Sequence, residues 1–166
     1  MGTYCNTNTC ATCIDCAAGT YSTVTGRTSA CTNCGAGYYC SATTRTPCPA
    51  GSYCGSANCT ECTKCAGGTY NKGTANQGCI ACEKKYFCAG GIHKELCPMG
   101  TYCNATNCAS CTPCPAGKYN QSLVSTACLN CGLGYYCTGG THRAACPSGS
   151  VCMGQNCSIC STCTAG

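Results

Sequence analysis

Apolar and polar positions along this chain follow no long regular period. No stretch keeps a 3.6-residue apolar period for more than one turn, so no helix is predicted. Gly, Pro, Asn, Ser and Thr interrupt every segment, a pattern typical of turns and loops. We therefore expect short strand pairs of two or three residues, forming β-hairpins within mostly irregular backbone, and little or no helix.

Large apolar side chains are too few to form a conventional core. Phe87 is the one phenylalanine, and Trp is absent. The aliphatic side chains are Leu96, Leu123, Leu129, Leu133, Ile14, Ile80, Ile92, Ile159, Val24, Val124 and Val151. This set cannot offset a backbone ordering cost of roughly 1–2 kcal/mol per residue. Covalent staples, either disulfides or metal sites, must replace the missing core.

The cysteines are the source of those staples, and they define a tandem repeat. The 166 residues include 28 Cys, well above the roughly 8–10% that marks a disulfide scaffold. Successive octads, spaced C-x4-C-x2-C-x2-C-x13/14-C-x2-C-x5-C-x7/8-C, begin 49 residues apart, at Cys5, Cys54 and Cys103, and Cys152 begins a fourth. We predict repeats at residues 1–50, 51–99 and 100–148 and a partial repeat at 149–166. Repeats that contact only their neighbours favour an elongated rod or superhelix.

A smaller motif, Cys-x-x-Gly-x-Tyr, recurs within each repeat. Cys16 to Tyr21 is one copy, and Lys85 stands where another copy would have Gly. Gly adopts positive φ at no steric cost, so the motif predicts a tight turn after the Cys. The following Tyr is interpreted as a packing residue whose ring covers a disulfide while its hydroxyl stays in water.

Zinc is the main alternative to disulfides. Cys13-x2-Cys16 and Cys31-x2-Cys34 together nearly match a four-thiolate zinc site. However, each repeat has eight cysteines, so such a site would leave four thiols without a use. His93 and His142 recur at matching repeat positions but lack metal-ligand spacing, so we interpret them as loop residues. We predict disulfides, with no metal and no cofactor.

Twelve cysteines are the candidate half-cystines. Eight cysteines allow 105 connectivities, so the pairing remains open. One hypothesis is that each motif loop closes on a later Cys, which would pair Cys16 with Cys31 and Cys34 with Cys48. The candidates in the three repeats are Cys16, Cys31, Cys34, Cys48, Cys65, Cys79, Cys82, Cys97, Cys114, Cys128, Cys131 and Cys146.

Four Asn-x-Ser/Thr sequons, at Asn58, Asn104, Asn120 and Asn156, indicate glycosylation. We predict N-glycans at Asn104 and Asn120. At Asn58 and Asn156 the middle residue is Cys, so disulfide formation competes with glycosylation. The Ser- and Thr-rich segments 22–28 and 41–46 are candidates for O-glycans. Glycosylation and disulfides both belong to an extracellular or cell-surface location.

Charge and hydropathy exclude several functional classes. The net charge is +5, and the basic residues are spread along the chain with one doublet, Lys84 and Lys85; nucleic-acid binding would need a basic cluster. No segment approaches the roughly 20 apolar residues of a membrane span. Regularly spaced cysteines give none of them the private basic environment of a catalytic thiolate. We therefore predict no catalytic residues.

No signal peptide is visible at the start of the chain. The sequence Met1-Gly-Thr-Tyr-Cys-Asn6 recurs letter for letter from Met99 to Asn104, inside a repeat. We therefore expect Met1 to be an internal residue of a longer protein.

The segments from Cys31 to Cys40 and from Thr46 to Cys54 are similar to the cysteine-rich repeats called GCC2/GCC3 or ephrin-receptor-like repeats. The segment from Cys16 to Cys34 also resembles tumour-necrosis-factor-receptor modules. The additional Cys10-x2-Cys13-x2-Cys16 cluster departs from those modules and is similar to protist surface antigens and to mastigoneme (flagellar hair) proteins. The resemblance implies a non-catalytic extracellular role.

The function that we expect is that of a structural repeat segment in a glycosylated extracellular filament or coat. The strict period favours self-association, because head-to-tail stacking generates open fibres. The alternative is a ligand-binding receptor ectodomain or a variable surface antigen of a protist.

Overall fold

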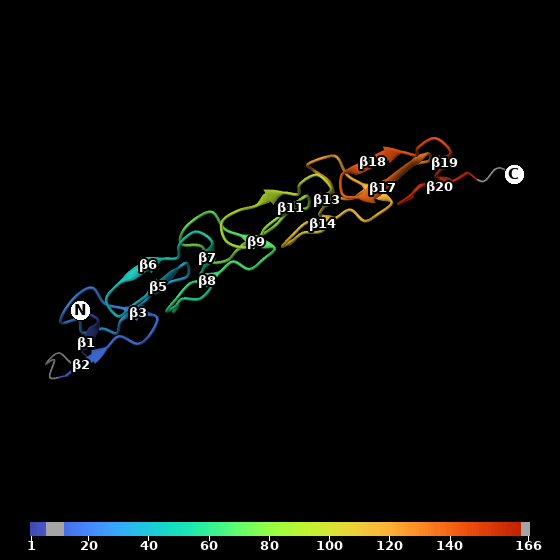
Figure 1. Ribbon diagram of the computed structural model, residues 1–166. Coiled ribbons are helices and arrows are strands. Elements are labelled where there is room, and N and C mark those ends of the chain that lie inside the picture. Colours follow the sequence, from blue (N-terminus) through green and yellow to red (C-terminus); the bar gives the residue numbers. More distant parts are fainter. Residues whose placement is uncertain (6–11, 164–166) are drawn as a thin grey trace. The chain divides into compact units, whose positions relative to one another are not determined.

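The computed structural model describes residues 1–5 and 12–163. Within these residues there is no helix, and the strands are two to five residues long. Consecutive strands pair into ten two-stranded sheets. Figure 1 shows examples of these hairpins, with β5 beside β6 and β17 beside β18. The predicted fold class, a disulfide-rich repeat of short β-hairpins without helix, is confirmed.

The chain divides into two compact units. The first comprises Met1–Ile80 and Gly90–His93. Its hairpins are β1 (Thr3–Cys5) with β2 (Cys13–Asp15), β3 (Thr20–Tyr21) with β4 (Thr32–Asn33), β5 (Tyr38–Cys40) with β6 (Arg45–Pro47), β7 (Ser52–Tyr53) with β8 (Thr63–Lys64), and β9 (Thr69–Tyr70) with β10 (Ile80–Ala81), whose last residue belongs to the second unit.

The second unit comprises Ala81–Ala89 and Lys94–Gly166. Its hairpins are β11 (Tyr86–Phe87) with β12 (Glu95–Leu96), β13 (Thr101–Tyr102) with β14 (Thr112–Pro113), β15 (Lys118–Tyr119) with β16 (Leu129–Asn130), β17 (Tyr135–Gly139) with β18 (His142–Ala145), and β19 (Ser150–Val151) with β20 (Ser161–Thr162). Both units therefore use the same building block.

The turn that precedes each first strand follows from the Cys-x-x-Gly-x-Tyr motif. In the first copy, the Thr20 amide donates to the Ala17 carbonyl at 3.0 Å, and Gly19 has φ +78°. A left-handed third residue is the requirement of a type II turn. The Thr20 hydroxyl donates to the same carbonyl at 2.7 Å. The predicted positive-φ turn is therefore present, and a side-chain hydrogen bond reinforces it.

Lys85 shows how strictly the turn requires this conformation. It occupies the glycine position of its motif copy and still adopts φ +75°, in the left-handed region that L residues avoid. The Tyr86 amide donates to the Glu83 carbonyl at 3.2 Å, closing the same turn. The turn thus persists where its usual residue is lost.

Cystine replaces an aliphatic core. Apart from Tyr70, every buried apolar side chain among the described residues is a cysteine. Ile80, Leu129 and Leu133 are exposed. The prediction that covalent staples replace the core is confirmed.

A buried polar side chain follows the motif tyrosine in each full repeat. Asn71 and Asn120 are each 2% exposed, and Ser22 occupies the same position in repeat 1. The Asn120 Nδ2 donates to the Thr101 carbonyl at 2.8 Å, while its Oδ1 accepts the Ser122 amide and the Ser125 hydroxyl. Buried polar groups need such partners, so this residue fixes the loop that follows the tyrosine.

The burial of Asn120 corrects its assignment as a glycosylation site. The amide nitrogen that would carry a glycan points into the repeat, so a glycan is incompatible with this packing. Asn71, which is not in a sequon, makes the corresponding bond to the Ser52 carbonyl at 3.1 Å. The Asn120 side chain therefore stabilises the packing of its repeat.

Candidate functional site at the junctions between repeats

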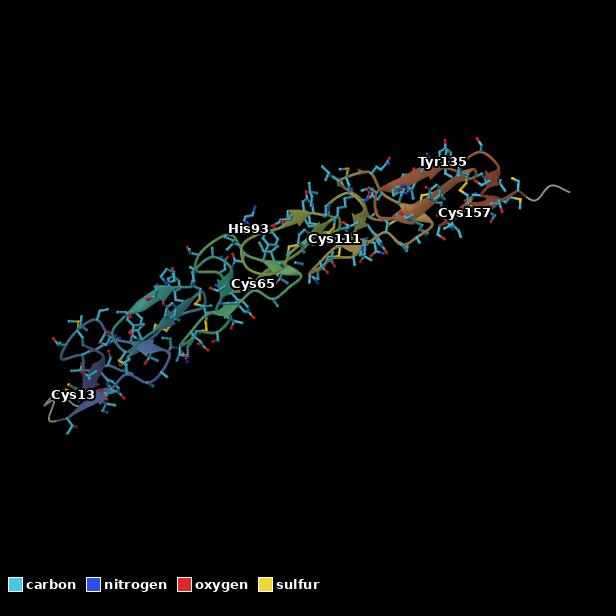
Figure 2. The ribbon with its side chains drawn as sticks, viewed as in Figure 1. Cys13, Cys65, His93, Cys111, Tyr135 and Cys157 are labelled. Carbon is cyan, nitrogen blue, oxygen red and sulfur yellow. A yellow bond between two sulfur atoms is a disulfide. The ribbon has the colours of Figure 1, made fainter. Side chains whose placement is uncertain are left out.

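The disulfides fall into four classes that repeat along the chain. Twelve are formed among the described residues, and all twelve predicted half-cystines take part; Figure 2 labels Cys65, Cys111 and Cys157 from three of the classes. The classes are Cys54–Cys59, Cys103–Cys108 and Cys152–Cys157; Cys16–Cys31, Cys65–Cys79 and Cys114–Cys128; Cys34–Cys40, Cys82–Cys88 and Cys131–Cys137; and Cys48–Cys62, Cys97–Cys111 and Cys146–Cys160.

Half of the pairing hypothesis is wrong. Cys16 does pair with Cys31, but Cys34 pairs with Cys40 rather than with Cys48. The physical reason is the tight turn between them: Gly35 and Gly37 both have positive φ and bring the Cα atoms of Cys34 and Cys40 to 5.7 Å. Cys48 is then left for a partner in the next repeat.

One disulfide in each period crosses a predicted repeat boundary. Cys48 lies in repeat 1 and its partner Cys62 lies in repeat 2. Cys97–Cys111 and Cys146–Cys160 do the same at the next two boundaries. We name these three places junction 1, junction 2 and junction 3. Junction 1 lies in the first compact unit, and junctions 2 and 3 lie in the second.

Two free thiols among the described residues follow the same register. Cys13 and Cys163 are exposed and unpaired, and Figure 2 labels Cys13. Cys13 is equivalent to Cys62, whose partner precedes it by 14 residues. Cys163 is equivalent to Cys114, whose partner follows it by 14 residues. Both free thiols therefore occupy positions whose equivalents in the other repeats are disulfide-bonded.

Backbone hydrogen bonds reinforce each junction. At junction 1 the Gly37 amide donates to the Cys54 carbonyl at 2.8 Å, and the Cys40 amide donates to the Cys59 carbonyl at 3.0 Å. The equivalent bonds are Lys85 to Cys103 and Cys88 to Cys108 at junction 2, and Gly134 to Cys152 and Cys137 to Cys157 at junction 3. These amides belong to the turn of one repeat and to the strand segment that follows it, and their acceptors belong to the disulfide loop of the next repeat.

A basic side chain holds the turn at junctions 1 and 3. The Arg45 guanidinium carbon lies 3.3 Å from the centroid of the Tyr38 ring, and its Nε donates to the Cys34 carbonyl at 2.7 Å. The distances for Arg143 are 3.6 Å to Tyr135 and 2.9 Å to the Cys131 carbonyl; Figure 2 labels Tyr135 on β17. A cation over an aromatic ring is attracted by its quadrupole. We call this arrangement the arginine clamp.

Junction 2 has a different arrangement. Lys94 replaces the arginine, and its Nζ lies 4.5 Å from the Tyr86 ring centroid and 3.0 Å from Oε2 of Glu83. Glu83 replaces the glycine of the other two turns, and it lies outside the left-handed region that Gly35 and Gly132 occupy.

As a result, the peptide group between Cys82 and Glu83 has the opposite orientation to the equivalent peptide groups at junctions 1 and 3. The Gly35 and Gly132 amides donate across the junction to the Ala57 and Gln155 carbonyls, each at 2.9 Å. At junction 2 the Cys82 carbonyl instead accepts the Asn107 amide at 2.8 Å. The direction of this hydrogen bond is therefore reversed at junction 2.

Sequence reasoning missed the clamp because it treated the basic residues as scattered surface charge. Arg45, Lys94 and Arg143 are spaced by 49 residues, so three of them follow the repeat period. This spacing could have predicted that the three side chains have the same structural role in each repeat.

The remaining sequons lie on the surface. Asn58, Asn104 and Asn156 are exposed. The middle residues of two of them, Cys59 and Cys157, are in disulfides. The middle residue of the Asn104 sequon is Ala105, so disulfide formation does not compete with glycosylation there.

Of the four cysteines in the alternative zinc site, Cys16, Cys31 and Cys34 are in disulfides and Cys13 is a free thiol. Within the described part of the chain, no group of three or more His, Cys, Asp or Glu residues is arranged to hold a metal ion. The same residues include no helix long and apolar enough to span a membrane. Comparison with protein-family models and with curated proteins finds no match to this chain.

Proposed function

We propose that this chain is a load-bearing segment of an extracellular structural array, such as a filament or coat, and that it has no catalytic role. The observation that carries the proposal is the disulfide that joins each repeat to the next at Cys48–Cys62, Cys97–Cys111 and Cys146–Cys160. A series of independently folded modules does not need such a bond. A chain that must resist extension gains from it at every period.

The disulfides also withhold most of the chain from extension. Cys48–Cys62, Cys65–Cys79 and Cys82–Cys88 bypass 14, 14 and 6 residues in series. About two thirds of the 49-residue period is therefore unable to lengthen under tension. Cys54–Cys59 lies inside the first of these loops and adds a second closure there.

The extracellular part of the proposal rests on redox chemistry. Disulfides persist in oxidising compartments and are reduced in the cytosol. A protein whose buried apolar side chains are nearly all cystine would lose its core on reduction. We also propose that the repeats are related to GCC2/GCC3 modules, to protist surface antigens and to mastigoneme proteins. Such a relationship would agree with an extracellular role.

Pulling single molecules tests the mechanical role. With its disulfides intact, each period should extend to about 70 Å, from roughly 3.3–3.6 Å per free residue plus the cystine spans. After reduction each period should extend to about 160–180 Å, the length of 49 residues at the same rise. Equal lengths under the two conditions would contradict the proposal.

Negative-stain images of the native secreted material test assembly. Filaments or sheets with a regular axial repeat support the structural array. Dispersed monomers at every concentration would favour the receptor or antigen alternative. The same preparation after mild reduction is the control, because loss of the junction disulfides should shorten or dissolve the assemblies.

A further inference from the structure

A shallow hollow lies beside Tyr102 in repeat 3. Its volume is 200 Å³, and its lining includes Tyr102, Asn104, Pro115, Lys118 and Thr126. Tyr102 is half-buried, and Asn104 is exposed at the rim. An aromatic ring and the acceptor residue of a sequon therefore share one hollow.

Repeats 1 and 2 have larger hollows at the equivalent place, without a sequon beside them. Hollows beside Tyr53 and Tyr4 have volumes of 410 and 360 Å³. The residue equivalent to Asn104 in repeat 2 is Gly55. A Cβ built on Gly55 would lie 3.9 Å from Cε2 of Tyr53 and 3.3 Å from the Gln77 carbonyl oxygen, so a side chain at this position begins beside the ring but crowds that carbonyl. The equivalent of Asn104 in repeat 1, Asn6, lies outside the described residues.

We infer that Asn104 carries an N-glycan whose first sugar occupies this hollow and stacks on Tyr102. The inference rests on the extracellular location in the proposed function. In the linking step Nδ2 of Asn104 forms a bond to C1 of the sugar and loses a proton. The bond from C1 to the lipid pyrophosphate donor breaks, and nothing is oxidised or reduced.

The chemistry of the hollow matches an N-acetylhexosamine. One face of a sugar ring presents C–H groups, which pack on the face of an aromatic ring. The edge of the sugar presents hydroxyl and acetamide groups, and Lys118 and Thr126 supply polar groups in the lining of the hollow. The sugar would cover the exposed flank of the Tyr102 ring, which is half-buried in the bare protein.

Fixed geometry at Asn104 supports the same conclusion. Cys103 is in the Cys103–Cys108 disulfide, and its amide donates to the Ser125 carbonyl at 3.3 Å. The backbone next to the acceptor is therefore held in place. A sugar attached there loses less conformational freedom on packing than one attached to an unrestrained loop.

The test uses the full chain secreted from a eukaryotic host. Mass spectrometry measures occupancy at Asn104, and an endoglycosidase then trims the glycan to one sugar. The variant Thr106→Ala abolishes the sequon while it keeps Asn104. We expect the single-sugar form to retain the thermal midpoint of the full glycoform, and Thr106→Ala to lower it by ~2–4 °C.

Nuclear magnetic resonance detects the stacking directly. Sugar protons above the Tyr102 ring should shift upfield, and this shift should survive in Tyr102→Phe and vanish in Tyr102→Val. A matched gain of function is the pair Gly55→Asn with Ala57→Thr, which places a sequon beside Tyr53. We expect occupancy and an upfield shift in this variant as well, and a higher thermal midpoint than in Gly55→Asn alone, which has the same contact with the Gln77 carbonyl but no sequon.

Two results would overturn the inference. One is secreted protein in which Asn104 is bare. The other is an occupied Asn104 with no upfield shift and a midpoint equal to that of Thr106→Ala. These measurements use monomers. If the sugar signals are present but no filaments form, the structural array is contradicted and the glycan inference is not.

Discussion

Junction 2 differs from junctions 1 and 3 in one small region, the turn that begins at Cys82. At junctions 1 and 3 a glycine follows the cysteine, and an arginine donates to the cysteine carbonyl. At junction 2 Glu83 follows the cysteine, Lys94 pairs with its carboxylate, and the cysteine carbonyl accepts the Asn107 amide. The disulfides and the main-chain hydrogen bonds from Lys85 and Cys88 are unchanged.

The comparison separates two kinds of interaction. The disulfides and the backbone hydrogen bonds are present at all three junctions and define the repeat. The basic side chain, the residue after the cysteine and the direction of one peptide change together, because an L residue avoids the left-handed conformation that glycine adopts at this place. The basic side chain therefore has two arrangements, the arginine clamp at junctions 1 and 3 and the Lys94–Glu83 pair at junction 2, while the disulfides stay the same.

Removing the junction disulfide should have the largest effect. Cys97→Ser with Cys111→Ser opens a loop of 14 residues, which the chain-entropy model values at about 3 kcal/mol. Cys48→Ser with Cys62→Ser should cost a similar amount at junction 1. Because junction 2 lacks the bond from an arginine to the turn carbonyl, we expect limited proteolysis to cut the junction 2 variant faster, as mapped by mass spectrometry of the fragments.

The control is Cys103→Ser with Cys108→Ser, which opens a five-residue loop worth about 2 kcal/mol in the same model. In this variant the Cys97–Cys111 disulfide stays closed, so we expect the protease to cut junction 2 more slowly than in the Cys97→Ser, Cys111→Ser variant. Equal cleavage rates at junctions 1 and 2 after loss of their disulfides would mean that the arginine clamp adds nothing.

Loss of the clamp itself should have the next largest effect. Arg45→Ala and Arg143→Ala each remove a charge-assisted hydrogen bond and a cation–π contact, and should destabilise by about 1–2 kcal/mol. Lys94→Ala should cost less than about 0.5 kcal/mol, because its partner Glu83 is 64% exposed. Chemical denaturation of the three variants measures the difference.

Arg45→Lys is the matched control for charge. It keeps the cation but cannot reproduce the Nε bond to the Cys34 carbonyl. We expect it to lose most of the stability that Arg45→Ala loses. Full retention of stability in Arg45→Lys would assign the clamp to charge alone.

The sequence predicted the cystine core, the short hairpins and the positive-φ turns, because these follow from composition and from the local chemistry of glycine. It did not predict that Cys34 pairs with Cys40 or that Asn120 is buried. A sequon and a spacing describe the chemical type of a residue, whereas pairing and burial depend on how the turn directs the chain. The clamp of Arg45 and Arg143 was visible only as a period of 49 residues, which a reading of net charge overlooks.

Relief of backbone strain at junction 2 should have a smaller effect of opposite sign. Lys85→Gly keeps φ +75° and removes a penalty of roughly 1–2 kcal/mol, which the greater freedom of glycine in the unfolded chain partly offsets. We expect a net stabilisation of about 0.5–1 kcal/mol by chemical denaturation.

Gly134 offers the reverse control. It has φ +76°, and a Cβ built there would have no neighbour within 4 Å. Gly134→Ala therefore measures the conformational cost without a clash, and should destabilise by about 1 kcal/mol. Gly37→Ala is not a suitable control, because its Cβ would clash with the Ala75 carbonyl. Stabilisation by Gly134→Ala would contradict the requirement for left-handed backbone at this turn.

Converting junction 2 to the other form should give the smallest change in stability and the sharpest test of the comparison. Glu83→Gly and Lys94→Arg should each be near neutral alone, since each leaves the second half of the clamp missing. Together they should restore an arginine bond to the Cys82 carbonyl, with a coupling free energy of about 0.5–1 kcal/mol in a double-mutant cycle.

Hydrogen exchange shows whether the peptide turns around in that double variant. In the native chain the Asn107 amide is bonded to the Cys82 carbonyl, so it should exchange slowly. In the double variant that carbonyl faces the arginine, so the Asn107 amide should exchange faster and the amide of residue 83 should become protected, as the Gly35 and Gly132 amides are. Additive stability changes with an unaltered Asn107 amide would show that the two forms are set by Asn107 and its φ of 64° rather than by the residue pair at 83 and 94.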